Sequence, residues 1–415
     1  MRPAGYSPRL QRLIAHLWSP DDGILTATNT RPPQGYREVE SYLVMRSVNH
    51  PDFLVPLTMG RTIASASLLT YNRLRIPKSR ALRVSVAIPT RAGLLPFRQA
   101  QRLRVYAHRD LSEDDLTGRL PTRWLAHALD TDPLVAAISV PAEGPNSKPT
   151  LQLFTSDGTP AGYAKFGWNE STARQVRNEV EAVNRMAARV STLQIPAVAW
   201  SSCWRGFDVA VIEPMAKEAR TWHGYVPPPL SVTEEIGQAG ETRTCALGDS
   251  ALVKELLAST EEQPAGTEPA LQALFRSAVD GVIARRGEVV LRNGAWHGDW
   301  VPWNLATAAG RTIAWDWEHS SSSAPLGFDL LHWHFQIAFI ARKQSLVDAL
   351  DNAKNGGAED VVTIQGSPAA LEACVDLYAL ELTSRYLRMH AAGAGWHPRF
   401  YPAITQVLTD LGAGG

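Results

Sequence analysis

The sequence predicts an α+β protein in which an antiparallel sheet precedes a mainly helical part. Three short strand-like runs follow one another at 134–141, 149–154 and 162–166, and turn-rich residues separate them. Such runs predict a meander of antiparallel strands. Long helical patterns dominate the second half of the chain. Residues 1–115 stand ahead of the meander, and we expect them to form an extra N-terminal α/β module.

Within these first residues, short apolar runs alternate with turns. The runs at 42–45 and 53–57 predict strands, 62–71 predicts a helix, and 83–89 predicts a further strand. A small α/β unit is the simplest structure that accommodates this alternation.

An amphipathic helix is predicted after the meander, at 170–190. Val176, Val180, Val183 and Met186 recur there at helical spacing and share one face. Farther along the chain we expect a strand at 209–212, long loops at 222–266, and helices at 270–285 and 368–390.

The charge of the chain is balanced overall but uneven along its length. The 415 residues include 41 Lys and Arg and 41 Asp and Glu, yet the first 110 residues hold 17 basic and six acidic side chains. A basic module can meet nucleic acid, an anionic membrane or an anionic substrate, or it can dock on an acidic neighbour in the same chain. No nucleic-acid-binding signature accompanies it, so we expect no nucleic-acid partner, and the module's own partner stays unassigned.

No apolar run approaches the roughly 18 to 20 residues that a membrane-spanning helix needs, and no secretory signal opens the sequence. We therefore expect a cytoplasmic protein without a membrane span.

The most informative segment is His297-Gly298-Asp299 followed by Asn304, with Asp316 twelve residues farther on. This H-G-D-x-x-x-x-N element, with a second aspartate just past a short apolar strand, is typical of a kinase catalytic loop and its metal-binding aspartate.

Phosphoryl transfer explains these residue types. The γ-phosphoryl group of ATP stays highly charged during transfer, so the site needs Mg²⁺ and accurate placement. Asn304 and Asp316 offer the hard oxygen ligands that Mg²⁺ prefers. Asp299 can orient the incoming hydroxyl and take its proton as the catalytic base. His297 can either brace the loop through backbone hydrogen bonds or act directly in acid–base catalysis.

The same chemistry needs a cation on the α- and β-phosphates of ATP. Lys165, in the third strand of the meander, can supply it, held by a carboxylate from the following helix. We favour Glu179 for that carboxylate. Glu181 is the alternative, but it lies about 200° farther around the helix.

With these residues, the chain from about 130 to 400 resembles the aminoglycoside phosphotransferase and choline kinase group of small-molecule kinases. The run 302–304, with Pro and Trp before the asparagine, resembles that group's catalytic loop, and 316–318 resembles its metal-binding triplet. Asp329 matches an aspartate that fixes the loop. The segment 213–215 resembles the hinge that meets adenine through backbone groups, which implies that Glu213 and Met215 flank the nucleotide.

The resemblance implies a two-lobed protein-kinase-like fold. The nucleotide-binding N-lobe would span 116–220, and the C-lobe, with the catalytic loop, metal and acceptor sites, would span 221–415. The module at 1–115 has no counterpart in a minimal antibiotic kinase, which favours a biosynthetic or tailoring role over resistance.

Other features have simpler interpretations. His332 and His334 lie two residues apart without further ligands, so we expect them to pack rather than to bind metal. The tryptophans around the loop are expected to pack as well. Trp300 follows Asp299 directly, and it can also line an acceptor pocket.

We therefore expect an ATP- and Mg²⁺-dependent phosphotransferase that acts on a hydroxyl of a small molecule such as an aminoglycoside, sugar or polyol. Two alternatives remain. One is a kinase for Ser or Thr of a peptide or protein in a modified-peptide pathway, and the other is a pseudokinase scaffold that has lost catalysis.

Overall fold

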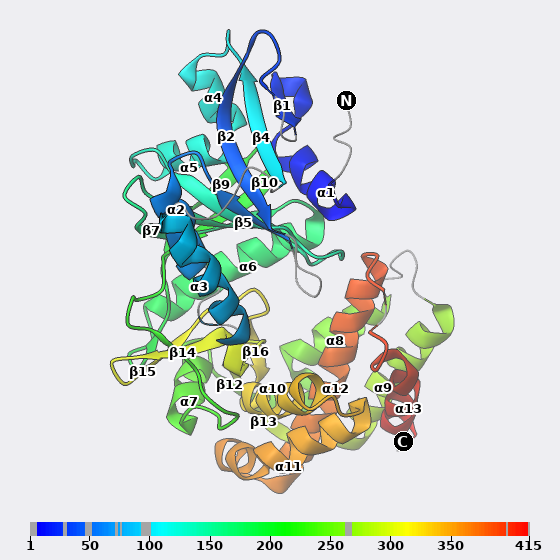
Figure 1. Cartoon of the computed structure of the whole chain (residues 1–415). Coiled ribbons are helices and arrows are strands. Elements are labelled where there is room, and N and C mark those ends of the chain that lie inside the picture. The colour runs from blue at the N-terminus through cyan, green and yellow to red at the C-terminus, as the bar shows by residue number, and fades with distance from the viewer. Residues whose placement is uncertain are drawn as a thin grey trace. The chain divides into compact units, whose positions relative to one another are not determined.

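The structure is a computed structural model that describes residues 6–27, 31–45, 52–70, 74, 77–92, 101–261, 268–395 and 397–413 (Figure 1). The chain divides into two compact units. The sheet unit comprises Met1–Glu143, Ser147–Arg177 and Ala197–Ala216, and the helical unit comprises Gly144–Asn146, Asn178–Pro196 and Lys217–Gly415. Within the described ranges, no helix combines the length and the apolar character needed to cross a membrane.

The described residues of the sheet unit build one nine-stranded sheet in the order β1-β4-β2-β3-β5-β6-β7-β10-β9. Every neighbouring pair is antiparallel. The predicted meander is confirmed as β5, β6 and β7, and the predicted strands at 42–45, 53–57 and 209–212 lie in or overlap β2, β3 and β10. The strands are β1 Ile24–Ala27, β2 Tyr36–Met45, β3 Phe53–Pro56, β4 Arg102–His108, β5 Val135–Ser139, β6 Thr150–Phe154, β7 Pro160–Gly167, β9 Val198–Trp204 and β10 Phe207–Ile212.

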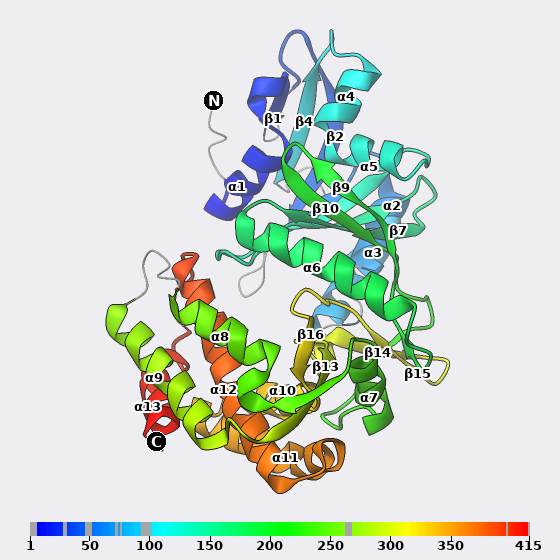
Figure 2. The same cartoon turned by 180° about the vertical axis from the view of Figure 1, so that it is seen from behind.

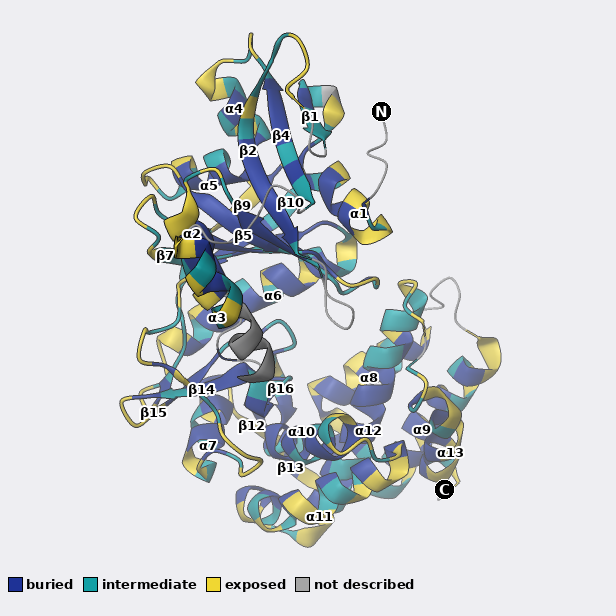
Figure 3. Ribbon diagram, in the orientation of Figure 1, coloured by how far each residue is buried: buried dark blue, intermediate teal, exposed yellow. Residues whose placement is uncertain are grey.

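Both faces of this sheet carry buried apolar side chains. Successive side chains of a strand point to opposite faces, so neighbouring residues of one strand enter different clusters. Tyr42 and Val44 of β2 belong to one buried cluster, which also holds Leu13 of α1. Leu43 belongs to the cluster on the other face, with Ile63 of α2. The second half of β2 and much of β4 are accordingly buried (Figure 3). The helices are α1 Pro8–Leu17, α2 Arg61–Thr70, α3 Pro77–Ala92, α4 Glu113–Arg119, α5 Pro121–Ala128 and α6 Glu170–Ala187.

Residues 1–115 share this sheet with the strands that follow. Their strands β1 to β4 occupy one side of it, and β3 pairs with β5 through Leu54 and Ile138. The predicted module boundary at 115 and 116 therefore falls inside the sheet unit, and the described strands before it all belong to the nine-stranded sheet.

The predicted strand at 83–89 is wrong, because these residues lie inside the helix α3. Val84, Val86 and Ile88 alternate with other residues, which is the apolar pattern of a strand. The buried residues are instead Ala87 and Thr90, which are three positions apart and share one helix face. The neighbouring prediction of a helix at 62–71 is confirmed by α2, although Tyr71 lies outside the described residues.

The helical unit packs α8 to α13 around a second apolar core (Figure 2). The predicted helices at 270–285 and 368–390 are confirmed as α9 and α12. The expected α+β class, with an antiparallel sheet and a mainly helical part, is thereby confirmed as well. The helices are α7 Leu230–Gln238, α8 Ala251–Glu261, α9 Pro269–Arg286, α10 Phe328–Gln336, α11 Leu346–Gln365, α12 Pro368–Ala391 and α13 Tyr401–Gly412.

Two small sheets also belong to the helical unit. One has the order β11-β14-β15-β8 and the other has the order β12-β13-β16. Their strands are β8 Leu193–Gln194, β11 Arg220–Thr221, β12 Arg243–Ala246, β13 Val290–Trp296, β14 Leu305–Ala308, β15 Arg311–Ala314 and β16 Ser321–Pro325.

The prediction of long loops at 222–266 is wrong over much of its length, because α7, β12 and α8 lie there. A glycine in this range serves close packing against β13 instead. A Cβ atom on Gly237 would lie 2.5 Å from Leu326, and one on Gly294 of β13 would lie 2.3 Å from the carbonyl oxygen of Gly237. The missing side chains let α7 approach β13 closely.

Glu235 of α7 anchors the segment that leads into β8. Its carboxylate accepts the N–H groups of Thr192 and Leu193 at 3.0 Å and the Thr192 hydroxyl at 2.6 Å. Burial acts to raise the pKa of Glu235, but hydrogen bonds from Thr192 and Ser191 outweigh it and lower the pKa to about 2. Since β8 pairs with β15, this anchor supports the strand that leads to Asp316.

Replacing Glu235 with Gln should therefore destabilise the protein in a pH-dependent way. A lowered native pKa gives stability that is present above the ordinary pKa of about 4.3 and is lost as the pH falls toward 2. We expect Glu235→Gln to lower the free energy of unfolding by about 1 kcal/mol at pH 7. Urea unfolding from pH 7 down to pH 3 should show the difference from the wild type shrinking. Glu234→Gln, on the same helix, is the control, and a difference that grows toward acid would contradict the assignment.

Candidate functional site

The loop after β13 is fixed by one buried carboxylate. Asp329, in the first turn of α10, accepts the backbone N–H of His297 at 2.8 Å and that of Gly298 at 3.2 Å. Burial raises the pKa of Asp329 to about 7, against the effect of these two N–H donors. From α12, Arg385 donates to the carbonyl oxygen of Gly298 at 2.6 Å. The peptide units that precede Asp299 are thus held by donors and acceptors from two helices.

Only glycine fits at position 298. Gly298 has φ +81°, which side chains disfavour, and a Cβ atom there would lie 2.0 Å from the carbonyl oxygen of His319. The glycine of the H-G-D motif therefore permits the close approach of the loop after β13 to the segment that follows Asp316.

His297 is fully buried, and backbone groups occupy both of its ring nitrogens. Its Nε2 lies 3.1 Å from the carbonyl oxygen of Trp315, and its Nδ1 accepts the N–H of Asp299 at 3.2 Å. Burial lowers the pKa of His297 to about 4. These contacts favour the bracing interpretation of His297 over direct acid–base catalysis.

Asp299 presents its carboxylate between two side-chain donors. Asn304 donates from Nδ2 to Oδ2 at 2.7 Å, and His332 Nε2 lies 3.2 Å from Oδ1. Burial acts to raise the pKa of Asp299, but the hydrogen bond from His332 holds it below the ordinary value. The side chain of Asp299 is about one third exposed, so it is both oriented and accessible.

A tight hairpin brings Asn304 and Asp316 to the same end of a strand pair. Strands β14 and β15 pair from Leu305 and Ala314 to the turn at Ala309 and Gly310, where φ is positive at both residues. Asn304 stands just before β14, and its carbonyl oxygen accepts the N–H of Trp315 at 3.3 Å. Asp316 follows directly, with φ +71°, a conformation that Asp tolerates better than most residues.

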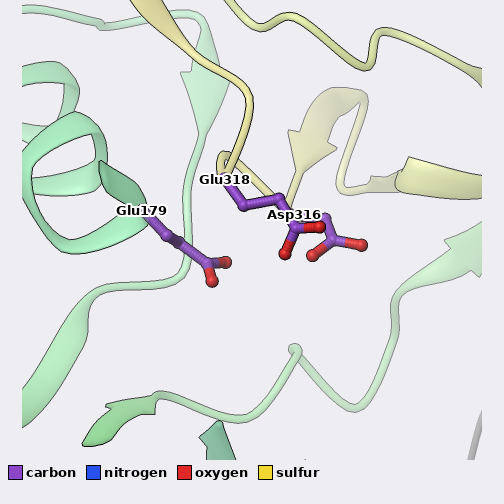
Figure 4. A group of neighbouring side chains, drawn as sticks. All are labelled: Glu179, Asp316 and Glu318. Atoms are coloured by element: carbon purple, nitrogen blue, oxygen red, sulfur yellow. The ribbon is translucent and has the colours of Figure 1, made fainter. Parts of the chain in front are cut away.

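Three carboxylates of the helical unit meet at this point. One oxygen each of Glu179, Asp316 and Glu318 lies within 4.8 Å of the others (Figure 4). Glu179 comes from α6 and is buried, whereas Glu181 is exposed. Asn178, beside Glu179, donates to the carbonyl oxygens of Glu318 at 2.8 Å and Ser320 at 2.9 Å. The helix is thereby tied to the segment that carries the other two carboxylates.

The sequence predicts Glu179 as the partner of Lys165, and it predicts Asp316 but not Glu318 as a metal ligand. In the structure both glutamates join Asp316. The signal for Glu318 was its place two residues after Asp316, in the triplet at 316–318.

The remaining predicted residues belong to the sheet unit. Lys165 is half-buried on β7, where it pairs with Thr150 of β6 and Ala210 of β10, on the face opposite Ala164 and Phe166. Its pairing with Glu179, which belongs to the helical unit, stays a prediction.

The hinge residues follow β10. Glu213 is exposed, and its backbone N–H donates to the carbonyl oxygen of Ala197 at 2.9 Å. Met215 is half-buried. Their expected contact with adenine likewise stays a prediction.

The sequence predicts packing for both Trp300 and His332, but it does not predict the contact of His332 with Asp299. Trp300 is completely buried, with its ring 5.5 Å from that of His297, which agrees with packing. His332 is buried too, as expected, but it also contacts Asp299, and sequence reasoning missed this because the two residues are 33 positions apart.

No model of a known protein family matches the chain, and no curated protein matches it. Solved structures are similar to it at 13% sequence identity. A thermostable aminoglycoside phosphotransferase APH(4)-Ia, crystallised with ADP and hygromycin B, gives a TM-score of 0.45 and covers 71% of this chain and 98% of its own. Choline kinase LicA from Streptococcus pneumoniae gives 0.40, with 64% and 89% covered. The ADP-bound aminoglycoside phosphotransferase APH(2'')-Ib gives 0.39, with 69% and 94% covered.

These are the kinase groups that the catalytic-loop motif resembles. With TM-scores below 0.5 the likenesses carry no conclusion about activity. Any such conclusion depends on the side chains described above.

The requirement for glycine at position 298 can be tested against a matched glycine. Gly310 has nearly the same φ, +77°, but no atom lies within 4 Å of the place its Cβ would take. Gly310→Ala should cost about 1–2 kcal/mol for the left-handed conformation alone. Gly298→Ala should cost clearly more, because it adds the clash with His319. Chemical denaturation measures both losses, and equal losses would show that the close approach to His319 does not constrain the loop.

Proposed function

We propose that the protein is an ATP- and Mg²⁺-dependent phosphotransferase that acts on a hydroxyl group of a small molecule. The observation that supports this most strongly is the arrangement around Asn304. Its side chain orients Asp299, and it shares the open end of one hairpin with Asp316, which is one of three clustered carboxylates. A hydroxyl-activating carboxylate and a metal-binding group are the two parts that phosphoryl transfer requires.

The donor set fits Mg²⁺. Glu179, Asp316 and Glu318 offer carboxylate oxygens, and Asn304 can add its amide Oδ1, because its Nδ2 is engaged by Asp299. Hard oxygen ligands suit this ion, and like charges this close together favour a bound cation. When bound, Mg²⁺ would neutralise charge on the phosphates and hold them in place.

Asp299 would act on the acceptor. Its carboxylate, oriented by Asn304 and His332, can accept the proton of the acceptor hydroxyl while that oxygen forms a bond to the γ-phosphorus and the bond to the ADP oxygen breaks. Its lowered pKa keeps it ionised and ready for this step at neutral pH. His297 and Asp329 would keep the loop in place without touching substrate.

Nucleotide binding is assigned to the remaining predicted residues. Lys165 would bind the α- and β-phosphates, and the backbone of Glu213 and Met215 would meet the adenine. The acceptor would be an aminoglycoside, sugar or polyol in a biosynthetic, tailoring or resistance role.

Turnover by the purified protein tests this function. With Mg²⁺ and ATP, one acceptor class from a panel of aminoglycosides, sugars, polyols and Ser or Thr peptides should stimulate ADP release. Asp299→Ala should lower kcat by about 10²-fold or more, since general-base catalysis contributes about 10²–10⁴-fold. Asp351→Asn, which changes an exposed carboxylate of α11, is the control. Stimulation only by peptides would favour the peptide kinase, and no nucleotide binding or turnover at all would refute the proposal.

The carboxylate cluster predicts a metal dependence with a readout besides activity. Mg²⁺ that binds only the folded protein raises its melting temperature. Glu318→Gln and Glu179→Gln should reduce that increase and should raise the Mg²⁺ concentration for half-maximal turnover by about tenfold or more. Glu181→Gln changes an exposed carboxylate on the same helix as Glu179 and should behave as the wild type. If all three variants respond to Mg²⁺ alike, the cluster is not the metal site.

A further inference from the structure

His332 lies deep in the helical unit and contacts Asp299 directly. It is 2% exposed, its Nε2 is 3.2 Å from Asp299 Oδ1, and its Nδ1 is 2.8 Å from the hydroxyl of Tyr378 on α12. The rings of Trp296 and Tyr378 meet it edge to face at 6.3 and 6.0 Å. The imidazole is therefore enclosed by aromatic rings and hydrogen-bonded at both nitrogens.

The chemistry of the partners fixes the direction of these hydrogen bonds. An ionised carboxylate only accepts, so His332 Nε2–H must donate to Asp299. A neutral imidazole then has an acceptor at Nδ1, and the Tyr378 hydroxyl must donate to it. Burial lowers the pKa of His332, which agrees with a neutral ring. The result is a chain of donors that runs from Tyr378 through His332 to Asp299.

Helix α10 thereby controls Asp299 in two ways. Asp329 and His332 are three residues apart and lie on the same helix face. Asp329 holds the backbone at 297 and 298, and His332 holds the Asp299 side chain. Asn304 contacts the other carboxylate oxygen, and each oxygen keeps a lone pair for a further donor.

We propose that His332 is a positioning residue of the phosphotransfer site, whose Nε2–H, held in place by Tyr378, orients the Asp299 carboxylate toward the acceptor hydroxyl. The inference rests on the proposed function. The proton of the acceptor hydroxyl goes to Asp299, and His332 keeps its own proton throughout, so no proton passes through the imidazole.

Variants that keep or remove the donor test this role. His332→Phe keeps a ring but cannot donate, and it should lower kcat by about 10- to 100-fold with KM for ATP within about twofold. His332→Gln places an amide N–H near the Nε2 position and should recover much of that loss. Tyr378→Phe should have a smaller effect of the same kind. His334→Gln on α10 and Tyr386→Phe on α12 are the matched controls. Wild-type kcat in His332→Phe, or equal losses in the controls, would overturn the inference.

Nitrogen NMR of protein labelled with ¹⁵N-histidine tests the hydrogen bond without turnover, with His332→Gln assigning the signal. At pH 7 we expect a neutral Nε2–H tautomer that changes when Asp299 is replaced with Ala. A charged ring, an Nδ1–H tautomer or a signal indifferent to Asp299→Ala would overturn the inference. Failure of the proposed function is distinguishable, because the wild type itself would then lack turnover. If turnover depends on Asp299 but not on His332, only the positioning role falls.

Discussion

The site depends on one buried acceptor, the carboxylate of Asp329. It receives two consecutive backbone N–H groups, and so it fixes the direction in which the chain leaves β13. The direction of the chain after β13 determines the left-handed conformation of Gly298 and the position of the Asp299 side chain. A buried carboxylate is costly unless donors satisfy it, which ties the formation of the loop to the docking of α10.

A second constraint is the short hairpin β14–β15. Two residues with positive φ close it, and pairing then brings its ends together, so residues twelve positions apart become neighbours. Asn304, whose side chain contacts Asp299, stands at one end, and Asp316 of the carboxylate cluster stands at the other. The hairpin thus places the residues proposed for hydroxyl activation next to those proposed for metal binding.

The sequence revealed those parts of the site whose geometry is local. Asp299, Asn304 and Asp316 lie on one loop and one hairpin, so their spacing predicts their proximity. The contacts of His332 and Glu179 depend on the packing of distant helices, and no pattern in the chain encodes them. The helix α7 was missed because the segment 222–266 is rich in Pro, Gly, Thr and Glu, although Gly237 serves packing against β13 rather than a loop.

The continuous nine-stranded sheet bears on how the chain can be divided. Strand β5 has β3 on one side and β6 on the other, and both apolar faces of the sheet extend across that junction. A protein cut between 115 and 135 would present the bare edge of β5 and two half-covered apolar surfaces, which are the usual starting points of aggregation. The segment before β5 therefore cannot be deleted without exposing the sheet. Tags or fusions belong at the chain ends rather than at this junction.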